Sequence, residues 1–175
     1  MGSRAELEKR YKGARSNLLL MIGLSLLNIV LLILNAGISF LFSATAPTVL
    51  VGLGLVFKED PTLNALGGIC FALGFVVIGI YGLFYWLSKK HKAFMLVSFI
   101  FFAIDTLLLF WVLTLGFEIG VLIDIAFHVW VLYALGRGVW AWTHLMDLPD
   151  EPPAVPAAPS PVYGDVGPGE PPAPF

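Results

Sequence analysis

Hydrophobic residues occur along this chain in long runs, and polar residues are largely confined to the short stretches between them. Four runs reach the length of about 20 residues that a helix needs to cross a bilayer. They predict membrane-spanning helices at residues 17–35, 66–87, 93–115 and 119–142. The pattern therefore predicts an all-α fold, a polytopic transmembrane helical bundle of four spans (residues 17–145).

A fifth apolar stretch, residues 38–57, is interrupted by Ser43, Thr45 and Pro47. Proline suits the first turn of a helix, so Pro47 predicts that a short helix begins there. The ten residues that follow are too few to span a bilayer. We therefore predict a short re-entrant or interfacial segment between the first two spans.

Composition supports a membrane setting. Charged residues make up 13% of the chain, whereas a soluble domain carries about 25%. The basic clusters are short and flank apolar runs, so we expect a lipid bilayer as partner and no nucleic acid. Phosphate-binding glycine loops and Cys/His zinc spacings are absent, and the single cysteine, Cys70, has no intrachain partner. The sequence thus predicts no cofactor.

The distribution of Lys and Arg predicts the orientation. With four spans and a cytoplasmic N-terminus, nine basic residues face the cytoplasm and only Lys58 lies outside. A fifth span at 38–57 would give a less asymmetric split of six to four. We therefore expect a multi-pass protein of the cell membrane with both termini cytoplasmic and a basic juxtamembrane segment, predicted as a short helix, at residues 1–16.

Residues 146–175 differ in composition from the rest of the chain. Ten of the twelve prolines fall there, together with acidic residues and no Lys or Arg. Such a segment cannot bury enough apolar surface to fold, so we predict a disordered, Pro-rich acidic tail. Its PxxP pattern from Pro153 to Pro156 offers the alternative of a ligand for an SH3-like groove.

Ionisable residues inside the predicted spans are the candidates for function. An Asp at a helix centre costs about 2.5–3.5 kcal/mol on insertion scales, so it needs a partner. Asp105 lies in the third span, and Asp124 and His128 lie on one face of the fourth. The first span adds Asn28 and Asn35. We expect these groups to converge as an intramembrane polar cluster in the outer half of the membrane.

Three interpretations of this cluster remain open. The first is interhelical hydrogen bonding, in which Asp105 accepts from His128 or Asn28. The second is a proton or ion relay. The third is a metal site with Asp105, Asp124 and His128 as ligands. Asp105→Asn should cost little stability under the first interpretation and abolish activity under the second.

Small residues predict the helix-packing surfaces. Gly68, Ala72 and Gly79 share one face of the second span, and Ala134 and Gly138 share one face of the fourth. Such faces let helix backbones approach closely. We expect this packing inside one chain; the alternative is a contact with another membrane protein or a second copy in a homo-oligomer.

Several runs resemble a group of small polytopic membrane proteins of Firmicutes-type bacteria. They are Asn17-Leu-Leu-Leu, Asn28-Ile-Val-Leu-Leu, Phe40-Leu-Phe-Ser-Ala before Pro47, Phe102-Ala-Ile-Asp105-Thr and Ile123-Asp124-Ile-Ala-Phe-His128-Val-Trp130. The resemblance covers residues 14–142 and excludes the Pro-rich tail, where the group is expected to carry a charged one. The resemblance implies the topology and the polar cluster and supplies no function.

The leading functional hypothesis is a non-enzymatic structural or interaction module, or a subunit of a larger complex. The second hypothesis is a small transporter or a proton-coupled or ion-coupled protein. The third is an intramembrane metal-dependent enzyme. Both alternatives would use Asp105, Asp124 and His128, so the arrangement of these side chains decides among the three.

Overall fold

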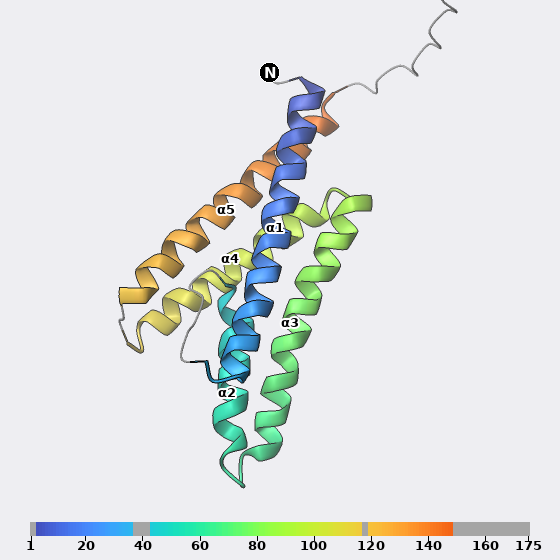
Figure 1. Cartoon of the computed structure of the whole chain (residues 1–175). Helices are drawn as coiled ribbons and strands as arrows, with labels where there is room; N and C mark the ends of the chain where they lie inside the picture. The colour runs from blue at the N-terminus through green and yellow to red at the C-terminus, as the bar shows by residue number, and fades with distance from the viewer. Residues whose placement is uncertain (1–2, 37–42, 117–118, 149–175) are drawn as a thin grey trace, which may run out of the picture.

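The computed structural model describes residues 3–36, 43–116 and 119–148, which form five α-helices (Figure 1). In chain order they are α1 Arg4–Ile33, α2 Thr45–Lys58, α3 Asn64–Lys90, α4 Phe94–Leu113 and α5 Ile119–Met146. Within the described ranges, all but α2 are long and apolar enough to cross a membrane. The predicted all-α bundle of four spans and one shorter segment is confirmed.

α1 is one continuous helix, so the segment predicted as a separate juxtamembrane helix is its first part. Ser3 begins it by accepting a hydrogen bond from the Glu6 backbone N–H at 3.3 Å. At about 1.5 Å per residue, 30 residues extend about 45 Å, which exceeds the ~30 Å hydrocarbon core. The N-terminal turns of α1 therefore stand beyond the apolar part of the bundle.

Contacts between helices bring most basic residues to one end of the bundle, here called the basic end. The Tyr11 hydroxyl of α1 donates to the Ser88 carbonyl at the end of α3 at 2.7 Å. Arg10 lies over the Trp140 ring of α5, 5.3 Å from its centroid. The start of α1, the junction of α3 with α4 and the end of α5 therefore lie together, and the turn between α2 and α3 lies at the opposite end.

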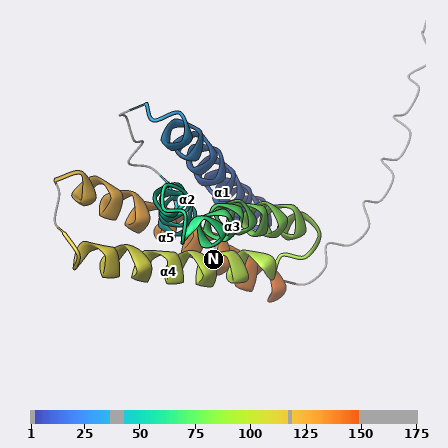
Figure 2. The ribbon, with the colours of Figure 1, turned by 90° about the horizontal axis from the view of Figure 1, so that it is seen from below.

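α2 lies among α1, α3 and α4 (Figure 2). It begins beside the middle of α4 and runs to the opposite end, where it turns into α3. Its 14 residues extend about 21 Å, which is shorter than a bilayer core. α2 is therefore the shorter segment expected between the first two spans, and it packs against three of the long helices.

Glycines let α2 and α3 approach each other. A Cβ added at Gly67 would lie 2.8 Å from the Lys58 N and 2.9 Å from the Gly54 O. A Cβ at Gly74 would lie 2.5 Å from a methyl of Val51 and 3.0 Å from the Pro47 O. Only hydrogen fits at these positions, so the backbones of the two helices are in direct contact.

The expectation that Gly68, Ala72 and Gly79 pack inside the chain was wrong. All three are exposed, and a Cβ added at Gly68 or Gly79 meets nothing within 4 Å. α3 turns the neighbouring face, which carries Gly67 and Gly74, toward α2. A helix position shifts by about 100° per residue, so an error of one position selects a different face.

The small residues of α5 do lie at a helix contact. Ala134 is buried, and a Cβ at Gly138 would lie 2.5 Å from the Cβ of Ala14 in α1. The same Cβ would lie 3.3 Å from the Met95 side chain of α4. The C-terminal half of α5 therefore packs closely on the first part of α1.

Candidate functional site

The carboxylate of Asp105 is buried and directed at the first turn of α2. Its Oδ2 accepts a hydrogen bond from the Thr45 N–H at 2.8 Å, and its Oδ1 accepts one from the Ala46 N–H at 2.7 Å. The residue is 4% exposed. A helix N-terminus carries about half a positive charge, and hydrogen bonds to a charged group are about twice as strong as neutral ones. Asp105 therefore caps α2 from another helix, with both oxygens.

The other backbone N–H groups at the start of α2 are also accounted for. The Ala44 N–H donates to the Ser25 Oγ of α1 at 2.8 Å, and Pro47 has no N–H. A helix start in hydrocarbon needs such partners because no water is present to replace them. Side chains of α1 and α4 together therefore make a buried helix start possible at this depth.

His128 of α5 completes the contact from the other side. Its Nε2 lies 3.2 Å from the Asp105 Oδ2 and 3.3 Å from the Thr45 Oγ1. Its Nδ1 lies 2.9 Å from the Asp124 carbonyl oxygen. The ring is 1% exposed and stacks on Phe102 with centroids 4.9 Å apart. Packing and hydrogen bonding thus fix the orientation of the imidazole.

The partners of His128 define what its two nitrogens do. A carbonyl oxygen only accepts, so Nδ1 carries a proton. Nε2 then either donates a hydrogen bond to the Asp105 Oδ2 or accepts one from the Thr45 hydroxyl. The imidazole is therefore held between the carboxylate that caps α2 and the first residue of α2 itself.

Asn28 of α1 joins the site through the segment that precedes and begins α2. Its Nδ2 donates to the Ser43 Oγ at 3.0 Å and to the Thr48 Oγ1 at 3.4 Å. Asn28 and Ser43 are both buried. The start of α2 is thus held from two sides, by α1 through Ser25 and Asn28 and by α4 and α5 through Asp105 and His128.

The structure does not bring all the predicted residues together. Asn35 is exposed at the end of α1, where its φ of 49° forms a left-handed C-terminal cap; the Ala36 N–H donates to the Leu31 O at 3.1 Å. Asp124 is half-buried and contacts His128 through its carbonyl oxygen. Among the described residues, the Asp124 carboxylate makes no hydrogen bond or ion pair. The predicted cluster is thus reduced to Asp105 and His128, with Asn28 nearby.

The third interpretation, a metal site with Asp105, Asp124 and His128 as ligands, finds no support in the described part of the chain. No three His, Cys, Asp or Glu side chains gather there closely enough to hold a metal ion. Asp105 and His128 touch, whereas Asp124 offers its main chain in place of its carboxylate. Both Asp105 oxygens already accept backbone N–H groups.

Sequence reasoning missed the main partners of Asp105 because they are backbone amides. Thr45 and Ala46 contribute N–H groups, which no residue type reveals. The available signal was Pro47, which marks a helix start inside an apolar stretch.

A second missed residue is Tyr81 of α3, which is 1% exposed and whose hydroxyl has no hydrogen-bond partner among the described residues.

Comparisons with protein families, with curated proteins and with solved structures gave no match for the chain. The four long apolar helices are compatible with an integral, multi-pass membrane protein.

Proposed function

We propose that this chain is a non-enzymatic module of the cell membrane, either a structural or interaction protein or a subunit of a larger complex. The observation that carries the proposal is that Asp105 uses both carboxylate oxygens to hold the backbone of α2. A relay or a catalytic carboxylate needs an oxygen directed at a substrate or a water path. Asp105, an acidic residue that is unfavourable in the membrane interior, instead holds α2 in its place in the bundle.

The proposal includes the orientation predicted from the charges. The basic end gathers the first part of α1, the junction at Lys89–Lys92 and the last turns of α5, which supports a cytoplasmic location for both ends of the described chain. We also place the chain with the group of small bacterial membrane proteins that it resembles over residues 14–142.

A partner helix is part of the proposal. Gly68, Ala72 and Gly79 lie exposed on α3, where a neighbouring helix from another membrane protein or a second copy would approach closely. Their exposure supports an interaction module more than a self-contained bundle, because small residues contribute little contact with lipid.

A proton-coupled membrane protein is the second candidate. It is favoured by the contacts of His128 Nε2, which lies within 3.3 Å of both the Asp105 Oδ2 and the Thr45 Oγ1. A carboxylate, an imidazole and a hydroxyl then meet in the interior of the bundle. Protonation of Asp105 would weaken the cap on α2 and so couple a proton to the position of that helix.

Proteoliposomes decide between the two candidates. The full chain is reconstituted into vesicles that contain a pH-sensitive dye, and a pH difference is imposed across the membrane. The expected result is a proton flux equal to that of empty vesicles. A flux above that level that is lost in His128→Gln and kept in the control His144→Gln would overturn the proposal and establish the second candidate. Among the described residues, the contacts of His144 are local ones with Trp140 and Thr143 at the end of α5.

A further inference from the structure

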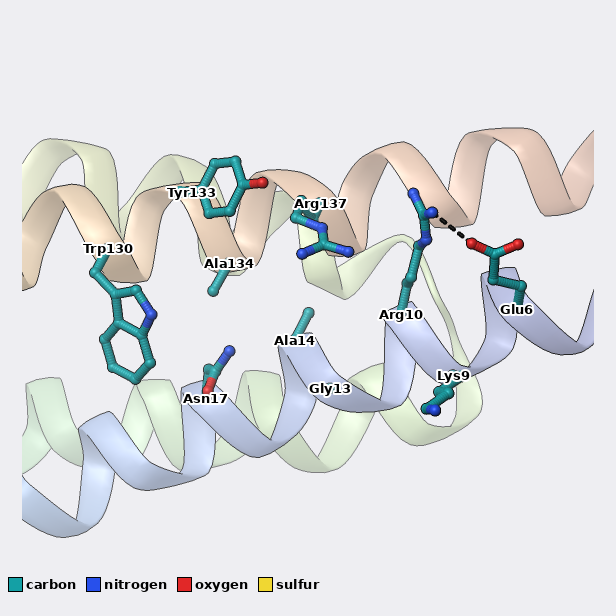
Figure 3. A pocket seen from close by; sticks show the side chains of 10 residues that line it. All are labelled: Glu6, Lys9, Arg10, Gly13, Ala14, Asn17, Trp130, Tyr133, Ala134 and Arg137. Carbon is teal, nitrogen blue, oxygen red and sulfur yellow. Dashed lines mark hydrogen bonds and ion pairs between the residues drawn. The ribbon is translucent and has the colours of Figure 1, made fainter. Parts of the chain in front are cut away.

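A cavity of about 430 Å³ opens between the first part of α1 and the C-terminal half of α5 at the basic end (Figure 3). Three cations line it, Lys9 and Arg10 from α1 and Arg137 from α5, against one carboxylate, Glu6. Glu6 pairs with Arg10. Within the described residues Arg137 has no carboxylate partner; its guanidinium lies 5.7 Å from the Tyr133 ring centroid. The lining is therefore net positive.

The cavity changes in character along the two helices. Figure 3 shows Arg10 and Arg137 toward one end, and Asn17 and Trp130 toward the other. Trp130 also lines a second hollow of about 330 Å³ between the same helices, with Leu20, Leu24 and Ala126 among its walls. The two hollows share Trp130 as a wall and follow one another along α1 and α5, the first lined by charged residues and the second by apolar ones. They are together called the groove.

We propose that this groove binds one anionic phospholipid, with its phosphate at Arg10 and Arg137 and an acyl chain along Leu20, Leu24 and Ala126. Charge complementarity selects the occupant, because a net positive lining favours a net negative headgroup over a zwitterionic one. The apolar hollow distinguishes a lipid from a free phosphate, which has nothing to place there. The proposal depends on the membrane setting and is independent of the role of Asp105.

Native mass spectrometry of the full chain in mild detergent tests the headgroup. Phosphatidylglycerol and phosphatidylcholine with identical acyl chains are titrated separately. Phosphatidylglycerol should bind at least tenfold more tightly. Arg10→Gln/Arg137→Gln should weaken it by about 25-fold, at about fivefold per basic residue. The control Lys89→Gln/Lys90→Gln removes the same charge at the same end, outside the groove, and should change binding less than about twofold.

A second variant tests the acyl chain. Ala126 is exposed, so Ala126→Phe fills the apolar hollow without altering any charge. It should weaken phosphatidylglycerol at least fivefold and leave glycerol 1-phosphate binding unchanged. Because this variant keeps every salt bridge of the wild type, it decides the question even if the double arginine variant does not fold.

Several results would overturn the proposal. They include equal affinity for the two lipids, equal loss in the arginine and lysine variants, unchanged lipid binding in Ala126→Phe, and full displacement of the lipid by an equal concentration of inorganic phosphate, which would indicate a soluble-anion site. Binding that occurs only after Asp150→Asn/Glu151→Gln would identify the acidic end of the chain itself as the occupant and would likewise overturn it.

Discussion

At the scale of single residues, Asp105 explains how an acidic side chain is accommodated in an apolar bundle. An N-cap usually needs one side-chain oxygen, so Asn and Asp serve equally well there. Asp105 differs because each oxygen accepts a separate backbone N–H. Asparagine has one acceptor oxygen and one NH₂ group, and the NH₂ group would face an N–H donor. The substitution is therefore not conservative at this position.

Asp105→Asn should lower the free energy of unfolding by about 1–3 kcal/mol, the cost of a buried donor left without a partner. This expectation replaces the one from sequence, that hydrogen bonding alone would make the change cheap. The measurement is unfolding in mixed micelles followed by circular dichroism.

Asp124→Asn is the matched control for that experiment, because it makes the same chemical change on a half-buried carboxylate that holds no backbone group. It should alter the free energy of unfolding by less than about 0.5 kcal/mol. A similar loss in both variants would mean that charge, and not the two hydrogen bonds to α2, determines the effect.

At the scale of elements, the α2–α3 hairpin is fixed at both ends of α2. Its start is held by Asp105, and its last turn touches Gly67. The two contacts differ in physical origin: the hydrogen bonds from Asp105 are electrostatic, whereas the fit at Gly67 is steric. Together they explain how a 14-residue helix that does not span the bilayer keeps a defined position.

Gly67→Ala should separate α2 from α3, because its Cβ would lie within 3 Å of backbone atoms that cannot rotate away. We expect a loss of about 1–3 kcal/mol in the free energy of unfolding and faster hydrogen exchange along α2. Gly23→Ala, on an exposed face of α1 away from the proposed partner surface, should be neutral or slightly stabilising, because alanine favours the helix and its Cβ meets no neighbour. Equal effects at the two positions would contradict the close backbone contact.

Tyr11 connects α1 to the end of α3. Tyr11→Phe removes the hydrogen bond to the Ser88 carbonyl, which is buried and 2.7 Å long, and should cost about 1 kcal/mol of unfolding free energy. Tyr133→Phe, at a residue that is 64% exposed, is the control and should change the same quantity by less than about 0.5 kcal/mol. The prediction fails if the two variants unfold alike.

At the scale of the whole molecule, hydrophobic run length was sufficient to predict the number and order of the long helices, because about 20 apolar residues have few alternatives to a span. The position of α2 was only partly predictable. Pro47 predicted where α2 begins in the sequence. The place of that first turn within the bundle depends on Asp105, which lies 58 positions after Pro47 in the chain. The contact face of α3 was not predictable, since Gly67 and Gly68 are equally small and only their neighbours distinguish them.

Cysteine labelling tests the arrangement of the ends. In a Cys70→Ser background, Ser3→Cys and His91→Cys should react with a membrane-impermeant maleimide from the same side of the membrane. Thr62→Cys, in the turn between α2 and α3, should react from the other side. With the cytoplasmic orientation proposed above, only Thr62→Cys reacts in intact cells. Reaction of Thr62→Cys and His91→Cys from one side would contradict the bundle.

The cap on α2 has a consequence for biosynthesis. The ribosome makes α2 before it makes Asp105 and His128. The first N–H groups of α2 therefore lack their hydrogen-bond acceptor until α4 has been made. Until α4 and α5 have been inserted, the Thr45 and Ala46 amides need another partner, such as water at the translocon or a chaperone. The start of α2 therefore reaches its final contacts only when the C-terminal half is in place, and a chain that stops after α3 would leave the Thr45 and Ala46 N–H groups without these acceptors.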